Sequence, residues 1–400
     1  MTRLDRNKYA GILLLFIFIL LIILLVGVAL SLRTDPVEDR IKNNEVMNTL
    51  FVVEDGGRAL LTEIFMYYPV YQRGAMFEIP GNTGAIYASI DRTDRIDAVY
   101  NERGIQAYRS EIENLTKIDI PFTIELTVDN FCQLADILGG IKVFVPNAVD
   151  ITEDDGTRRL LPHGAISLDG DKLQDFLYYA LPDENESDVA ARRQEAFISF
   201  LSALNKNGAQ MLEKNNFRRM DTLFHSNLKR NSLNLLLKNI SYVDGEQITP
   251  NTIIGYEETT SDGIKVWTPL YGGQLVRDTI SMMTTSLISA DETTFSRTYA
   301  LRILNGTSTQ GFARNTSILL RGVGYDILAT GNADSPYEKT TIINHLGIEN
   351  ESVAKSLGDF IHCTNIVNEE AKSEDANYES GSNVDLTLIL GRDFDGRYVR

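Results

Sequence analysis

The longest uninterrupted hydrophobic segment of the chain lies near its N-terminus. Residues 10–30 read AGILLLFIFILLIILLVGVAL and include no charged side chain. At about 1.5 Å of rise per residue, a helix of this length spans the ~30 Å apolar core of a bilayer. The apolar part of a cleaved signal peptide is shorter, about 7–15 residues, although Gly27 and Ala29 leave cleavage open. The pattern predicts a retained transmembrane helix over residues 10–32.

Positively charged residues precede this segment. Arg3, Arg6 and Lys8 stand before it, and Asp5 is the one acidic residue among them. Short positively charged flanks stay on the cytoplasmic side of a membrane. We therefore expect a single-pass protein of the cytoplasmic membrane, with residues 1–9 in the cytoplasm and the bulk of the chain outside it.

Short apolar runs after the polar stretch RTDPVEDRIKNNE predict strands. Residues 48–53 read NTLFVV, and the runs IFMYY (64–68) and AMFEI (75–79) are separated by PVYQRG. Apolar runs of this length, bounded by turn residues, are typical of strands. The second and third runs are expected to pair as a hairpin.

A strand, a helix and a second strand are predicted between residues 120 and 146. Residues 121–128 form the first strand, and Asp129 or Asn130 can cap the helix that follows. Its apolar face carries Phe131, Leu134, Ala135 and Leu138. Two glycines at 139–140 stop the helix, and IKVFVP returns as a strand. This β-α-β unit favours a layered α/β domain.

Residues 187–207 predict a long amphipathic helix. Its apolar stripe consists of Ala191, Phe197, Phe200, Leu201 and Leu204. Arg192 and Arg193 lie near its start, where cations oppose the helix dipole. Either a bound anion or a surface ion pair with Asp188 or Glu195 would explain them.

The last hundred residues predict a smaller α/β domain. Residues 301–304 form a strand, and Ser308 or Thr309 caps a helix. The inward face of that helix carries Phe312, Ala313, Thr316, Leu319 and Leu320. Further segments at 340–346, 353–361 and 384–390 complete a β-α-β-β-α-β pattern. The acidic stretch 368–383 has too little apolar surface to fold and is expected to be a flexible loop.

Composition narrows the function classes. A chain of 400 residues that is 43% hydrophobic has room for two domains. The net charge of −17 argues against a nucleic-acid partner, whose binding needs clustered Lys and Arg. Cys132 and Cys363 are far apart and indicate neither a zinc site nor a disulfide framework. The four histidines are scattered and have no recognisable Ser or Cys partner motif, so no nucleophilic triad is indicated.

The segments and their order resemble two known families. Residues 48–290 resemble the LytR-CpsA-Psr (LCP) domain of bacterial envelope proteins. The motifs that carry this resemblance are NTLFVV, the IPxxT turn at 79–83, DRIDAVY, LADILGGIKVFVP, LPHGAISLDG, RRQEAFISFL and GIKVWTP. Residues 298–395 resemble the LytR C-terminal domain through LRILNGTSTQGFA, GYDILATGNA and VDLTLILGRDF.

The resemblance implies a fold and an activity. The fold would be an α/β/α layered domain with a mixed sheet, behind a single N-terminal transmembrane helix and followed by the smaller α/β domain. Members hold a polyprenyl chain in an apolar tunnel and its pyrophosphate at the mouth. They transfer glycopolymers from this carrier to peptidoglycan or another acceptor with a divalent cation, so Mg²⁺ or Mn²⁺ is implied only if this chain is active.

Most of the family's signature charges are missing. Two phosphates in a low-dielectric cleft require Arg forks, and a metal requires carboxylates. The family places an Arg and an Asp after the IP of the turn, where FEIPGNT has Gly81 and Asn82. Arg58 has no Asp close behind it, and Ala190 stands where the family has an Arg. A further expected Arg aligns with Tyr178 or Ala180.

Few candidate site residues remain. Arg193 and Gln194 match the family pattern directly. The resemblance therefore assigns phosphate or ligand binding to Arg193, Gln194, Arg58, Asn82 and Arg95, and it assigns no catalytic residue and no metal ligand.

Three functions are compatible with these residues. The missing charges favour an envelope protein that binds a polyprenyl-(pyro)phosphate-linked glycopolymer or peptidoglycan without transferring it. The second is an active phosphotransferase with relocated charges, which would include Arg58, Arg92, Arg95, Arg103, Asp91, Asp94 and Asp97. The third is a structural, peptidoglycan-associated scaffold. The run DRTDRID is more often typical of a solvated face than of a metal site.

Overall fold

The chain forms two compact units, residues 1–45 and 46–400. The computed structural model describes residues 13–22, 35–152, 156, 158–181, 184–289, 299–323, 325–369 and 384–394.

Within the described residues of the first unit there are two helical segments. Residues 13–22 are helical and lie within the expected membrane span, the rest of which lies outside the described residues. The second is α2 (Pro36–Lys42), whose first turn is capped by the carboxylate of Asp35. Among the residues that the structure describes, no helix combines the length and the apolar character needed to cross a bilayer.

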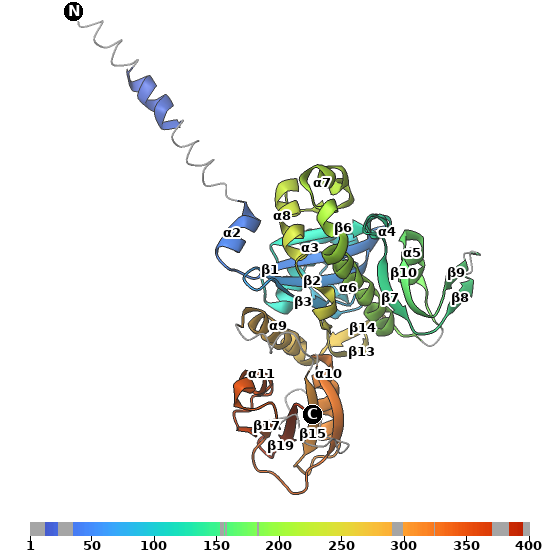
Figure 1. Cartoon of the computed structure of the whole chain (residues 1–400), viewed down its shortest axis with the longest axis vertical. Coiled ribbons are helices and arrows are strands. Elements are labelled where there is room, and N and C mark those ends of the chain that lie inside the picture. Colours follow the sequence, from blue (N-terminus) through green and yellow to red (C-terminus); the bar gives the residue numbers. More distant parts are fainter. Residues whose placement is uncertain are drawn as a thin grey trace, which may run out of the picture. The chain divides into compact units, whose positions relative to one another are not determined.

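The second unit is built around a mixed six-stranded sheet (Figure 1). Its strands are β1 (Met47–Asp55), β2 (Arg58–Tyr68), β3 (Arg73–Glu78), β6 (Phe122–Thr127), β11 (His225–Ser226) and β12 (Pro250–Asn251), in the order β11-β6-β1-β2-β3-β12. The pairs β1·β6 and β3·β12 are parallel, and the other neighbours are antiparallel. The predicted hairpin is confirmed as β2 and β3, joined by the turn after Tyr68.

Helices cover both faces of this sheet. Leu50 and Val52 of β1 share one core cluster with residues of α3 (Ile96–Thr116) and α9 (Gln274–Ile288). Phe51, between them, points to the opposite face, where its ring lies 5.1 Å from that of Phe197. Phe197 belongs to α6 (Glu186–Met211), which packs there with α4 (Val128–Ile137). Because side chains alternate along a strand, one apolar run supplies both cores, as the α/β/α expectation requires.

Shorter elements surround the sheet. The remaining helices of this part are α5 (Gly170–Tyr178), α7 (Lys214–Met220) and α8 (Arg230–Ile240). Four two-stranded ribbons pair β4 (Gly84–Tyr87) with β5 (Arg92–Arg95), β7 (Ile141–Val145) with β10 (Gly164–Leu168), β8 (Val149–Thr152) with β9 (Arg158–Leu161), and β13 (Gly255–Thr259) with β14 (Lys265–Pro269). The predicted β-α-β unit is therefore wrong in its pairing, because β7 pairs with β10 and does not join β6 in the main sheet.

The C-terminal part forms its own five-stranded sheet. It consists of β15 (Ala300–Asn305), α10 (Phe312–Gly322), β16 (Asp326–Asn332), β17 (Thr341–Asn344), α11 (Glu351–Ile361), β18 (Ile366–Asn368) and β19 (Leu386–Leu390). The strand order is β16-β15-β19-β17-β18. The predicted pattern is confirmed except for β18, a short extra strand. Most of the expected flexible loop, residues 370–383, lies outside the described residues.

Several local predictions need correction. Thr127, and neither Asp129 nor Asn130, caps α4 by accepting a hydrogen bond from the Asn130 amide. No side chain caps α10, which begins after Gly311 in the left-handed conformation. Ala191 is exposed, although its place in the apolar stripe predicts burial.

Candidate functional site

A cavity of about 490 Å³ lies where β2 begins, β3 ends and α6 starts. Arg58, Asn82, Arg95 and Arg193 all contribute to its wall. The structure thus brings together four of the five residues assigned to ligand binding, although they come from separate segments of the chain. Gln194 does not line this cavity.

Arg193 is held half-buried in the cavity wall by backbone carbonyl groups. Its Nε donates to the carbonyl of Leu177 at 3.0 Å, and its Nη1 donates to that of Leu60 at 3.3 Å. Burial, and secondly the neighbouring Arg192, lower the pKa of Arg193 to about 10. Within the described part of the chain, no carboxylate forms an ion pair with this guanidinium. Arg193 is therefore a fixed cation whose charge is poorly compensated.

Arg95, in contrast, is already paired. Its Nη2 lies 2.8 Å from Oδ2 of Asp97, and its Nη1 lies 3.1 Å from Oε1 of Glu186. All three residues contribute to the cavity wall. The positive charge of Arg95 is consequently offset before any ligand arrives.

Arg58 is the most loosely held cation of the wall. Its side chain is 76% exposed, and its nearest acidic partner is Asp55 at 4.0 Å. Such an exposed ion pair contributes little to stability and is screened by salt. Arg58 is free to swing toward a ligand but is not preorganised for one.

The turn between β3 and β4 explains what Gly81 and Asn82 do. The carbonyl of Gly81 accepts a hydrogen bond from the Asp97 amide at 3.0 Å, and a Cβ at position 81 would lie 3.0 Å from Oδ2 of Asp97. The carbonyl of Asn82 accepts from the Trp267 amide at 2.7 Å. The turn is thus packed against Asp97, and a side chain at position 81 would push on that carboxylate.

Gln194 faces the main sheet and lies outside the cavity lining, so its assignment to the ligand stays a prediction. Its side chain is buried, and Nε2 donates to Oε2 of Glu63 at 3.3 Å and to the carbonyl of Asn251 at 3.1 Å. Arg193 and Gln194 are adjacent in a helix and therefore point in different directions, so only the first reaches the cavity.

Two buried glutamates were missed by sequence reasoning. Glu63 of β2 and Glu78 of β3 are register partners, and Glu78 also lines the cavity. Burial raises the pKa of Glu78 to about 7, and burial followed by repulsion from Glu78 raises that of Glu63 well above its usual range. The signal was an acidic residue directly before one apolar run (Glu63 before IFMYY) and one inside the next (Glu78 in AMFEI).

Arg192 is a structural residue, which corrects the expectation of a surface pair or a ligand contact. Its Nη2 lies 2.9 Å from Oε2 of Glu184, and both side chains are at most 10% exposed. The same nitrogen donates to the carbonyl of Tyr179 at 2.7 Å, and the guanidinium stacks 3.6 Å from the ring centre of Tyr179. Arg192 fixes the loop between α5 and α6, while Asp188 completes the helix cap with Asn185.

Four of the seven charged residues of the alternative, relocated site lie outside the cavity lining. Of that set, Arg58, Arg95 and Asp97 line the cavity. Asp94 is buried and accepts hydrogen bonds from Nε of Arg92 at 2.7 Å and from the Arg95 amide at 2.8 Å, so it stabilises β5. Among the described residues, no cluster of three His, Cys, Asp or Glu side chains has an arrangement that could hold a metal ion.

Comparison with solved structures shows a shared fold. TagV of Bacillus subtilis is 18% identical, with a TM-score of 0.52 over 60% of this chain and 96% of that one. A Streptococcus agalactiae protein is 14% identical, with a TM-score of 0.54 over 62% and 89%. An Enterococcus faecalis protein described as a transcriptional regulator is 16% identical, with a TM-score of 0.51 over 61% and 89%. No curated protein sequence matches significantly.

Two family models match the sequence itself. The model of the LytR cell envelope-related transcriptional attenuator matches residues 298–394. The model of the LytR_cpsA_psr family matches residues 71–283, which is more than half of the 400 residues. The chain therefore belongs to the LytR-CpsA-Psr family and carries a LytR C-terminal domain.

Proposed function

We propose that this protein is a membrane-anchored, extracytoplasmic component of the cell envelope that binds a polyprenyl-(pyro)phosphate-linked glycopolymer without transferring it. The anchor would be the apolar segment 10–32, with residues 1–9 in the cytoplasm. The ligand's phosphate would occupy the cavity beside Arg193, with Arg58 and Asn82 as further polar contacts.

The observation that carries this proposal is the partly buried guanidinium of Arg193, which forms no direct ion pair with a carboxylate of the described cavity wall. The described cavity wall holds the carboxylates of Asp55, Glu78, Asp97, Glu184 and Glu186 and three guanidinium groups. Arg95 pairs with Asp97 and Glu186, Arg192 pairs with Glu184, and Arg58 lies 4.0 Å from Asp55. Glu78 attracts Arg193 electrostatically but forms no ion pair with it. Arg193 remains, and a poorly solvated cation gains most from an anion brought into contact with it.

The absence of transfer is argued from the residues that replace the family's charges. Gly81, Asn82 and Ala190 supply no charge to the cavity, although all three line it. Asp97 is the carboxylate nearest the turn, and it is neutralised by Arg95. Losing one preorganised donor costs about 3–4 kcal/mol of transition-state stabilisation, so losing several should abolish turnover.

One observation favours a rearranged transferase as the second candidate. Glu78 lines the cavity with a pKa near 7, which suits a general base at neutral pH. Glu78 would then activate the acceptor hydroxyl, while Arg193 holds the phosphate. Turnover, rather than binding, distinguishes this candidate from the first.

The test is carrier binding by the full chain in phosphatidylcholine nanodiscs. Geranylgeranyl pyrophosphate serves as the probe and is titrated by calorimetry. We expect binding that Arg193→Ala weakens at least tenfold. Arg277→Ala is the matched control, because Arg277 also donates to a backbone carbonyl, that of Leu115, but lies outside the cavity. No binding, or equal binding by both variants, would instead favour the structural scaffold.

A further inference from the structure

Helix α9 belongs to two hydrophobic cores at once. Val276, Ile280 and Leu287 are buried in the core beneath the main sheet. Leu275 is buried in the core of the C-terminal domain, and Met282 packs against it. The two domains of the second unit therefore share this helix along part of its length.

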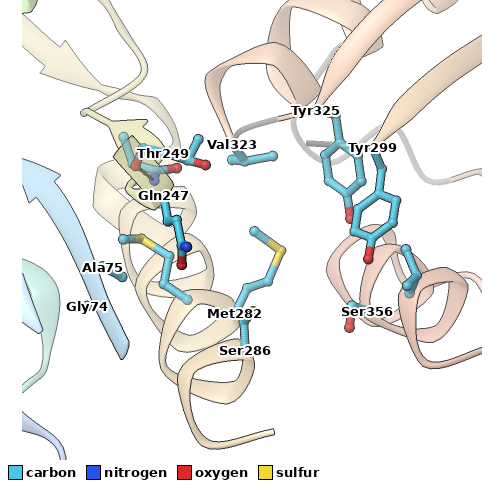
Figure 2. A pocket seen from close by; sticks show the side chains of 13 residues that line it. Gly74, Ala75, Gln247, Thr249, Met282, Ser286, Tyr299, Val323, Tyr325 and Ser356 are labelled. Atoms are coloured by element: carbon cyan, nitrogen blue, oxygen red, sulfur yellow. Dashed lines mark hydrogen bonds between the residues drawn. The ribbon is translucent and has the colours of Figure 1, made fainter. Parts of the chain in front are cut away.

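The shared helix borders a cavity of about 130 Å³. Gln247, Met282 and Ser286 line it from the first domain, and Tyr299, Tyr325 and Ser356 line it from the second. Figure 2 shows the two tyrosines side by side, with their hydroxyl groups directed toward Ser356, and the amide of Gln247 directed toward Met282. No lining residue is shared with the Arg193 cavity.

The described lining of this cavity carries no formal charge. It contains no Asp, Glu, Lys, Arg or His, in a protein whose net charge is −17. A charged ligand would be desolvated there without an opposite charge, which is costly. The lining therefore selects an uncharged occupant.

The polar groups of the lining argue against a purely apolar occupant. Within the described residues, neither the amide of Gln247 nor the hydroxyl of Tyr325 has a hydrogen-bond partner. Burial, and secondly the neighbouring Tyr299, raise the pKa of Tyr325, so its hydroxyl stays a donor at neutral pH. An alkyl chain packed on the half-buried Tyr325 would leave its hydroxyl unsatisfied at a cost of about 1–3 kcal/mol, whereas Gln247 is exposed and offers its amide to a polar occupant.

We propose that this cavity binds an uncharged sugar unit of a glycan, such as an N-acetylhexosamine. A pyranose ring presents C–H faces that match the tyrosine rings and Met282, and an edge of hydroxyl groups that matches Gln247, Tyr325 and Ser356. Ligand sites commonly combine aromatic and apolar walls with a few oriented polar groups, and they often lie between domains. This site is independent of the proposed carrier binding, because the two cavities are separate.

The test uses the full chain in phosphatidylcholine nanodiscs and chitotriose, a neutral trimer of N-acetylglucosamine, as the probe. Saturation-transfer difference NMR measures binding. Tyr325→Phe removes one hydroxyl and keeps the ring, so we expect a loss of affinity of about three- to tenfold. Ser356→Leu fills the cavity and should abolish binding. Tyr256→Phe is the matched control, since Tyr256 is exposed on β13 outside the cavity, and it should bind like the parent.

Three results would overturn the proposal. The first is the absence of saturation transfer at millimolar chitotriose. The second is binding that neither Tyr325→Phe nor Ser356→Leu changes while both variants keep the parent's melting temperature. The third is Ser356-dependent binding of decanol in place of chitotriose, which would make the cavity a lipid site.

Discussion

Glu63 and Glu78 are direct partners across β2 and β3, and their side chains are 0% and 4% exposed. Oε1 of Glu63 has no hydrogen-bond partner among the described residues. Two carboxylates this close and this poorly hydrated do not both ionise readily. The pair therefore retains at least one proton at neutral pH, directly beside the cavity that holds Arg193.

This pair predicts a specific pH dependence of stability. The pKa of Glu78 rises from 4.5 to about 7 on folding, so the folded chain binds more protons than the unfolded chain between these values. The free energy of unfolding should then fall as pH rises through this window, by at most about 1.4 kcal/mol per unit of pKa difference. Glu78→Gln should flatten that slope. Urea unfolding followed by the fluorescence of the single tryptophan, Trp267, measures it. An unchanged slope in the variant would contradict the assignment.

Arg192 should matter for stability and not for the ligand. Arg192→Ala leaves the buried carboxylate of Glu184 without its partner, and removing one member of a buried ion pair costs about 3–5 kcal/mol. Arg158→Ala breaks the exposed pair with Asp150, which solvent and salt screen, and should hardly change the free energy of unfolding. Urea unfolding compares the two variants. Equal losses would show that the Arg192 pair is not buried in solution.

Gln194→Ala tests whether Gln194 serves the stability of the fold while its neighbour Arg193 serves ligand binding. The variant removes the donor to Glu63 and to the buried carbonyl of Asn251, so it should lose about 1–3 kcal/mol of stability. Its affinity for geranylgeranyl pyrophosphate should stay within twofold of the parent in calorimetry. A loss as large as that of Arg193→Ala would place Gln194 at the ligand after all.

Salt should distinguish the two candidate arginines. Arg58 is largely exposed, so its attraction to a phosphate is screened, whereas Arg193 acts at short range in a partly buried wall. Arg58→Ala should weaken carrier binding about two- to threefold at low ionic strength and hardly at all near 0.5 M salt. Arg193→Ala should weaken carrier binding at both salt concentrations. A salt-independent effect of Arg58 would mean that the side chain folds into the site on binding.

The elements of the fold could be predicted because hydrophobic period and turn residues specify them locally. NTLFVV, the hairpin after it and the inward face of α10 all lie where the apolar pattern places them. The pairing partner of β7 could not be predicted from the sequence, because β7 has the same apolar alternation whether it joins β6 or β10. The predicted helix caps were also wrong: Thr127, two residues before Asp129, caps α4, and α10 begins after Gly311, two residues beyond Thr309 and without a side-chain cap.

The site could be predicted in part. Arg193 and the turn at residues 80–82 were found through their motifs, and folding brings them to one cavity. The roles of Arg192 and Gln194 could not be read from the helix, because burial depends on the loop before α6 and on β12. The pairing of Glu63 with Glu78 could not be predicted either, because the register of β2 and β3 alone brings the two side chains together.

The most direct test of the central claim is turnover by the full chain in nanodiscs. Geranylgeranyl pyrophosphate is incubated with Mg²⁺ or Mn²⁺, and released phosphate is followed over time in the parent and in Arg193→Ala. Binding of the carrier that depends on Arg193, without metal-dependent release of phosphate, is the predicted result. Metal-dependent release that disappears in Arg193→Ala would contradict it, and would show that the charges of this cavity carry out the transfer.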